Sequence, residues 1–168
     1  DRTMTSTLKV DQIQLADGTA PTAADLGFAA GSVLQVTHNK TSSFVSFTST
    51  SFAATGISGT ITPTRSDSKI LVLASVNGIY KNGANMYLRT QIFRNSTLVF
   101  HQQEIAGYTN STGAGSDNVM SHHLDSPNST SLLTYEVYGQ VSSGTAYINN
   151  QNAGRAMESG ITLIEIAG

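Results

Sequence analysis

Apolar and polar residues alternate over short stretches from Gly31 to the end of the chain. Residues 86–94 show this pattern best, with Met86, Leu88, Thr90 and Ile92 on one side and larger polar or aromatic residues on the other. A period of two indicates β-strands. Residues 69–76 are apolar on both faces, which is typical of a strand in a sandwich core. The predicted strands are 32–38, 44–47, 51–55, 57–62, 69–76, 86–94, 98–103, 119–124, 132–141, 145–149 and 161–166.

Turn residues separate these strands at short intervals. Asn77-Gly78, residues 81–83, residues 94–96 and Ser143-Gly144 all have compositions that favour tight turns. The longest predicted loop is 107–118, which is rich in Gly, Ser and Asn. No helical period appears in this part of the sequence. Many short strands joined by turns predict an all-β protein, a jelly-roll-like antiparallel β-sandwich over residues 31–168.

Residues 1–30 have a different pattern and are interpreted as a short N-terminal docking arm. Leu8, Val10, Ile13 and Leu15 offer a narrow apolar edge, and the Asp17-Gly18 turn interrupts it. So short a segment cannot bury these side chains alone, so we expect the arm to lie on its own body, on a sister chain or on a larger assembly. The alternative is an ordered but functionless terminus.

Composition excludes several function classes. The net charge is −2 and the sequence pI is about 6.0, so no basic surface suggests nucleic acid or an anionic membrane as a partner. Charged residues make up 12%, against about 25% in ordinary domains, and Ser, Thr, Asn, Gln and Gly replace them. There is no cysteine, no apolar run of membrane-spanning length and no secretory signal pattern. We therefore expect no membrane insertion.

The residues capable of chemistry form no convincing catalytic or metal-binding pattern. His122 and His123 are neighbours, and in a strand their rings would point to opposite faces, so they cannot chelate one ion. At a threefold axis, one of them could still form a ring of three. The carboxylates are scattered, and serine occurs in no nucleophile-elbow motif. We predict no catalytic residue, no metal and no cofactor. The scattered carboxylates include Glu104, Asp117, Asp125, Glu136, Glu158 and Glu165.

Tyrosine provides the more suggestive signal. An exposed phenol ring can stack on a sugar or anchor a protein interface, although it can equally close the rim of a sandwich. Tyr108 lies in the long Gly/Ser/Asn loop, a composition that combines a rigid ring with adaptable polar groups. We predict this loop as the host-recognition surface, with Tyr108, Asn110, Ser111 and Asp117 as candidates. The other tyrosines considered were Tyr80, Tyr87, Tyr138 and Tyr147.

Several segments resemble a known family. The leader Thr7-Leu-Lys-Val-Asp-Gln-Ile-Gln14 resembles the N-terminal arm of tail-fibre and virion decoration proteins of aquatic tailed bacteriophages. The resemblance continues at 55–63, 68–72, 124–128 and 161–166, so it covers nearly the whole chain, although each motif consists of common turn and strand residues. It implies a homotrimer, and the low surface charge and outward apolar residues such as Phe93 favour the same state.

These observations predict a non-enzymatic structural virion protein. It would be a tail fibre or a capsid-decorating appendage, located on the virion after assembly in the host cytoplasm. Its arm would dock to a tail, baseplate or major capsid protein, and its distal loops would touch a host-surface glycan or protein. The alternatives are a small polysaccharide depolymerase and a free lectin-like carbohydrate-binding module. The predicted arm is an argument against the free lectin, because a free lectin does not need a docking segment.

Overall fold

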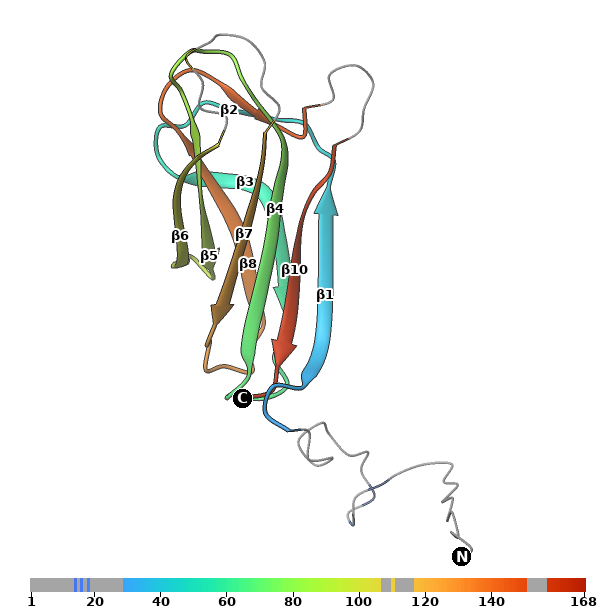
Figure 1. The fold of residues 1–168 in the computed structure, drawn as a ribbon. Coiled ribbons are helices and arrows are strands. Elements are labelled where there is room, and N and C mark those ends of the chain that lie inside the picture. Colours follow the sequence, from blue (N-terminus) through green and yellow to red (C-terminus); the bar gives the residue numbers. More distant parts are fainter. Residues whose placement is uncertain are drawn as a thin grey trace, which may run out of the picture.

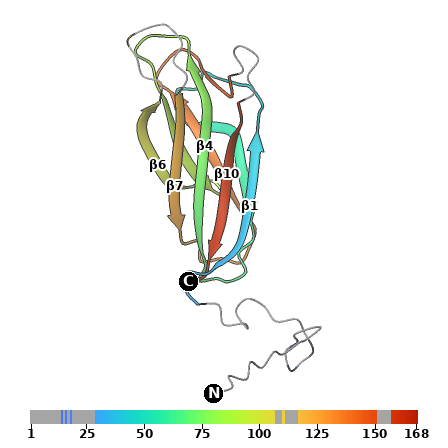
Figure 2. The same cartoon turned by 45° about the vertical axis from the view of Figure 1, so that its right-hand side comes forward.

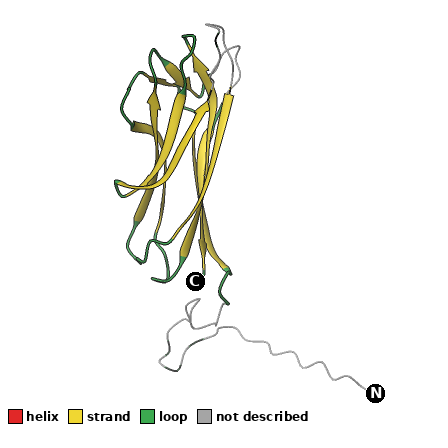
Figure 3. Ribbon diagram, turned by 60° about the vertical axis from the view of Figure 1, so that its left-hand side comes forward, coloured by secondary structure: helices red, strands yellow, loops and turns green. Residues whose placement is uncertain are grey.

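The computed structural model describes residues 29–106, 110, 117–150 and 157–168, together with Gln14, Ala16 and Gly18, and the backbone alone for residues 102–106. In this part of the chain the regular structure is ten strands without a helix (Figure 3). They are β1 Val33–Thr41, β2 Val45–Phe47, β3 Ala53–Ile61, β4 Lys69–Lys81, β5 Leu88–Arg94, β6 Thr97–Ala106, β7 Asp117–Asp125, β8 Leu133–Val141, β9 Ala146–Ile148 and β10 Ser159–Ile166.

The strands form two antiparallel sheets packed face to face (Figure 1). One sheet has the order β1-β10-β4-β7, extended at the far end of β4 by β9 and β2, and the other has the order β3-β8-β5-β6. Among the eight long strands, the first pairs with the last, the second with the seventh, the third with the sixth and the fourth with the fifth. This is the pairing of a jelly roll, and the predicted fold class is confirmed.

The alternation along the strands accounts for the core between the sheets. In β8 every second residue is buried, from Leu133 to Val141. Because successive side chains of a strand point to opposite faces, each such strand supplies one apolar face to the core. The largest fully buried side chains include Tyr135, Ile57, Ile70, Ile79, Met86, Leu88, Ile92, Ile148, Ile161 and Leu163.

Two glycines lie in strands rather than ending them. Asn77-Gly78 was predicted as a turn, but β4 runs on to Lys81 with a register shift against β7 between Val76 and Ile79. Gly78 has φ +61°, and an added Cβ would lie 2.9 Å from the backbone nitrogen of Asn150. The separate strands predicted at 51–55 and 57–62 are likewise one strand, β3, with a bulge at Gly56 (φ +80°). A bulge uses the same left-handed glycine conformation as a turn, which explains both errors.

At one edge of the sandwich, side chains of β1 form hydrogen bonds with the backbone of β3. Gln35, Thr37 and Asn39 point inward and donate hydrogen bonds to the backbone carbonyls of Thr62, Thr60 and Ser58, at 2.7, 3.0 and 2.7 Å respectively. Strand β3 is the outer strand of its sheet, so these carbonyls have no strand neighbour on that side. The side chains of β1 therefore satisfy an edge that would otherwise be free to pair with another chain.

The two ends of the sandwich differ. The chain enters β1 beside its own C-terminus, where the Gly31 nitrogen donates to the Ala167 oxygen and the Ala167 nitrogen donates to the Ser32 oxygen, both at 2.8 Å. We call this the terminal end. Strands β2 and β9 lie at the opposite end, which we call the distal end, together with the end of β6 and the start of β7 (Figure 1). The sandwich thus separates the entry of the N-terminal segment from the distal connections by the full length of its strands.

Candidate functional site

An aromatic groove lies on the short sheet at the distal end. Strand β9 pairs with β2 on one side and with the end of β4 on the other, which places Ser46, Tyr147 and Tyr80 in one row across three strands. The rings of Tyr80 and Tyr147 have centroids 5.7 Å apart at 43°. Phe44 stacks on Tyr147 from the β2 side, with centroids 5.4 Å apart and planes at 20°. Three rings from three distant parts of the sequence therefore form one surface.

Two amide side chains complete the lining of the aromatic groove. Asn82 and Asn150 join Phe44, Tyr80 and Tyr147 around a shallow space of about 410 Å³. Phe44 is 53% exposed, whereas the two tyrosines are half-buried. This size is in the range of sites for small molecules. Within the described part of the chain, the lining consists of ring faces and amide groups without a carboxylate or histidine, so it suits binding rather than acid–base chemistry.

Asn149 fixes the chain segment that carries Phe44. Its buried amide donates to the carbonyls of Thr41 and Ser43, at 3.2 and 3.0 Å, and accepts from the Ser159 hydroxyl at 2.6 Å. The Asn149 backbone has φ +56°, a conformation that Asn tolerates better than most residues. The connection between β1 and β2 is thereby attached to β9, and Phe44 is held against Tyr147.

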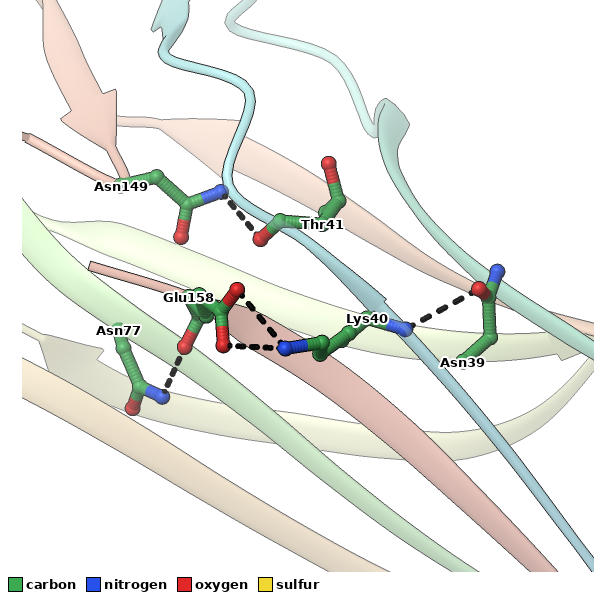
Figure 4. A network of polar contacts seen from close by, with 6 residues as sticks. All are labelled: Asn39, Lys40, Thr41, Asn77, Asn149 and Glu158. Atoms are coloured by element: carbon green, nitrogen blue, oxygen red, sulfur yellow. Dashed lines mark hydrogen bonds and ion pairs between the residues drawn. The ribbon is translucent and has the colours of Figure 1, made fainter. Parts of the chain in front are cut away.

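A second group of contacts fixes the start of β10 beside Asn149 (Figure 4). Lys40 forms an ion pair with Glu158 at 2.9 Å, and the Asn77 amide donates to the Glu158 carbonyl at 2.6 Å. The Asn77 nitrogen donates to the Ser159 hydroxyl at 2.9 Å. The ion pair is exposed and contributes little stability by itself. Together the bonds connect β1, β4 and the start of β10.

The structure tests the placement of only part of the predicted recognition loop. Tyr108 and Ser111 lie outside the described residues, and Asn110 is exposed. Asp117 was predicted in the loop but is the first residue of β7, where it pairs with Ile79. The strand ends that flank this loop, Ala106 and Asp117, are at the distal end (Figure 1). The candidate docking residues Leu8, Val10, Ile13 and Leu15 also lie outside the described residues.

The other tyrosines named from the sequence do not join the groove. Tyr138 packs against Phe93 on the outer side of the β3-β8-β5-β6 sheet, with centroids 4.4 Å apart. Phe93 is consequently half-buried rather than free on the surface. Tyr87 accepts a hydrogen bond from Arg89 at 2.8 Å, and the guanidinium carbon lies 4.7 Å from its ring centroid. Phe44 was not predicted as a site residue, because only the β2–β9 pairing brings it to the tyrosines.

The outward side of β1, β10, β4 and β7 carries an exposed apolar surface, which we call the outer face. Figure 2 shows these strands side by side, and their register places Val36, Ile164, Leu71 and Leu124 in one row across the sheet. The next row is His38, Thr162, Leu73 and His122. The most exposed apolar members are Met120 at 77%, Val33 at 58%, Val36 at 56%, Leu124 at 50% and Leu73 at 39%.

The side chains of His122 and His123 point to opposite faces of the sheet, because they are successive residues of β7. His122 is exposed on the outer face, and His123 packs inward with its ring centroid 5.5 Å from that of Phe100. His38, also on the outer face, makes a 2.9 Å hydrogen bond through Nδ1 to the Thr162 hydroxyl. Among the described residues no three His, Asp or Glu side chains lie close enough to hold a metal ion. No helix in the same residues is long and apolar enough to cross a membrane.

Two of the carboxylates that looked scattered in the sequence, Glu165 and Asp125, are buried at the terminal end. Glu165 accepts hydrogen bonds from Gln35, the backbone and hydroxyl of Thr64, and Ser68, at 2.6 to 2.9 Å. Burial alone would raise its pKa, but these bonds outweigh burial and hold the pKa below its ordinary value.

Asp125 is the second buried carboxylate. It accepts from Arg94 at 2.5 Å and from the Tyr135 hydroxyl at 2.7 Å, so it joins β7 to both β5 and β8 of the facing sheet. Burial and the bond to Asp125 raise the pKa of Tyr135. Both carboxylates lie far from the aromatic groove along the strands and make contacts that stabilise the fold.

Comparison with known proteins supports the fold. No model of a known protein family matches the chain, and no curated protein matches its sequence. Among solved structures, the chain is similar to the crystal structure of the infectious bursal disease virus VP2 subviral particle, with a TM-score of 0.52 and 13% identity. The match covers 95% of this chain and 37% of that one, so the chain spans little more than a third of the viral protein's length. At this identity the likeness concerns the fold.

Proposed function

We propose that this protein is a non-enzymatic structural protein of a virus particle, a tail fibre or capsid-decorating appendage of a tailed bacteriophage. The observation that carries the proposal is the jelly-roll pairing of the eight long strands, which the chain shares with a viral capsid protein. The resemblance of its leader to phage fibre and decoration proteins points to the same role. The described residues that line the aromatic groove include no carboxylate, so none of them favours a depolymerase.

The separation of the two ends supports attachment through the arm. The N-terminal segment enters the sandwich at Ala29, at the terminal end, where Gly31 and Ser32 are bonded to Ala167. An arm docked on a tail, baseplate or major capsid protein would therefore leave the distal end directed away from the particle (Figure 1). In this orientation the aromatic groove and the connection after β6 face the host surface.

The outer face supports assembly with further copies of the chain, for which we propose a homotrimer. Its middle rows, which hold Leu71, Leu73, Val36 and Leu124, contain no carboxylate, lysine or arginine. A second copy would thus meet no charge repulsion there and would bury apolar area. Contiguous exposed apolar surface on a soluble domain commonly marks an interface.

The proposal is tested by analysing purified phage particles. Quantitative mass spectrometry should find this chain in washed, nuclease-treated particles. Its copy number separates the two variants, because a capsid lattice repeats its decoration on the order of hundreds of times and a tail carries tens of fibres or fewer. If the chain appears only in the host lysate and never in particles, the structural role is wrong.

A further inference from the structure

We propose that the aromatic groove binds an uncharged pyranose ring of a surface glycan. The inference deepens the proposed attachment role, since it assigns a ligand class to the distal end. It depends on Phe44, Tyr80 and Tyr147, with the amides of Asn82 and Asn150. None of these residues belongs to the 107–118 loop that sequence reasoning selected.

The ring faces provide the apolar half of such a site. One face of a pyranose ring exposes a patch of C–H groups, which lies flat against an aromatic ring and buries apolar area. Tyr80 and Tyr147 are cross-strand neighbours, and Phe44 stacks on Tyr147. The rings are held by one another and by the Asn149 contacts, so binding would immobilise few additional side-chain torsions. This preorganisation lowers the entropic cost of binding.

The amides provide the polar half. The Asn82 oxygen accepts from the Thr145 nitrogen at 2.9 Å, which orients the amide and leaves its NH2 group without a partner among the described residues. The backbone nitrogen of Asn150 donates to the Gly78 carbonyl at 3.1 Å, and its side chain lines the groove. Amide groups both donate and accept, as the hydroxyl groups of a sugar require.

The charge distribution selects the class of sugar. Among the residues that the structure describes, no charged side chain lines the aromatic groove. Lys81, the next residue after Tyr80, points inward and is only 2% exposed, and Lys40 is paired with Glu158. An acidic sugar would lose water on binding without gaining a cation in return. The groove therefore favours neutral hexoses and N-acetylhexosamines over sialylated or uronic sugars.

The test uses the full chain and four defined probes. Saturation-transfer NMR is run with cellotetraose, mannotetraose, chitotetraose and, as the acidic probe, tetragalacturonate, in which every ring carries a carboxylate, each up to about 10 mM to cover weak single-site affinities. We expect at least one neutral probe to bind and tetragalacturonate to bind more weakly. Phe44→Ala and Tyr80→Ala should each weaken binding by about tenfold, and Phe44→Tyr should retain it.

The matched control is Phe93→Ala, which disrupts the other outward aromatic pair and should leave sugar binding unchanged. Thermal melting confirms that each variant is folded. Phe44 is exposed, so the Phe44→Ala variant remains informative even if Tyr80→Ala unfolds. Failure of all neutral probes to bind, equal binding by wild type and Phe44→Ala, or binding of tetragalacturonate alone would each overturn the assignment. None of these results would remove the chain from the virus particle, so the proposed function is judged separately by particle analysis.

Discussion

Individual buried polar residues stabilise the terminal end, and Glu165 is the clearest case. Replacing it with Gln keeps the shape but removes a charge that accepts four hydrogen bonds, including one from the Thr64 nitrogen. A charge-assisted bond contributes more than a neutral one, so Glu165→Gln should lower the free energy of unfolding by about 1–3 kcal/mol. Urea denaturation measures this loss. Glu136→Gln, at a half-buried position of β8, is the control and should change stability by less than about 0.5 kcal/mol.

The same carboxylate should make stability depend on pH. Because the folded state holds the pKa of Glu165 below its value in the unfolded chain, the folded state binds this proton more weakly. Its contribution is therefore complete above the unfolded pKa and is lost as pH falls through the folded one. As pH falls below about 5, the wild type should lose more stability than Glu165→Gln. Parallel stability curves for the two proteins would contradict the assigned contacts.

At the scale of strands, sequence patterns were sufficient for most of the fold. Alternation located the strands because each buries one face, and it grouped Met86, Leu88, Thr90 and Ile92 on one side, all four of which are buried. The predicted strand limits were wrong at two glycines, because each was interpreted as a turn residue that ends a strand. At Gly56 and Gly78 the positive φ serves a bulge inside a strand, and local sequence does not distinguish this from a turn.

The candidate site was largely unpredictable for a different reason. Phe44, Tyr80 and Tyr147 meet only because β9 pairs with β2 and with β4, and strand pairing over such separations depends on the whole fold. Likewise Asp125 was one of several scattered carboxylates in the sequence, and its partners Arg94 and Tyr135 come from the facing sheet. The sequence revealed the residue types that matter, tyrosine and amides, but not which of them come together.

The contacts between β1 and β3 predict how the sandwich edge behaves. Thr37→Val removes one of three side-chain bonds to the carbonyls of β3 and should cost about 1 kcal/mol. Replacing Gln35, Thr37 and Asn39 together with Ala, Val and Ala should also leave the edge of β3 open to another chain, so the variant should aggregate. Urea denaturation and light scattering measure the two effects. Thr60→Val, an exposed change on β3 itself, is the control, and a triple variant as soluble as this control would refute the edge-protecting role.

Removal of the predicted N-terminal arm should not affect the folding of the sandwich. Deleting residues 1–28 keeps the bonds of Ala29, Gly31 and Ser32 that begin the described sandwich. The truncated protein should unfold cooperatively within a few degrees of the full chain, which calorimetry can determine, because a domain's stability follows from its own core. Incorporation into particles should be lost. A truncated chain that fails to fold, or one that still enters particles normally, would argue against a docking arm.

The outer face is the surface through which we propose that whole molecules associate. We expect chains of 17.7 kDa to form trimers at micromolar concentration through the apolar rows of β1, β10, β4 and β7. Met120 is 77% exposed there, so Met120→Lys should leave the stability of a single chain nearly unchanged. In an interface, however, the same lysine would be buried without a partner in every copy, a cost large enough to prevent assembly.

Light scattering coupled to size-exclusion chromatography measures the mass of both proteins directly. Leu132→Lys is the matched control, since Leu132 is 60% exposed but lies next to β8, in the facing sheet. This variant should remain trimeric, because a lysine outside the interface stays in water in every copy. A wild-type monomer would refute self-assembly, and a trimer that survives Met120→Lys would place the contact on another surface. Only loss of the trimer in Met120→Lys, with retention in Leu132→Lys, assigns assembly to the outer face and leaves the distal groove free for the host.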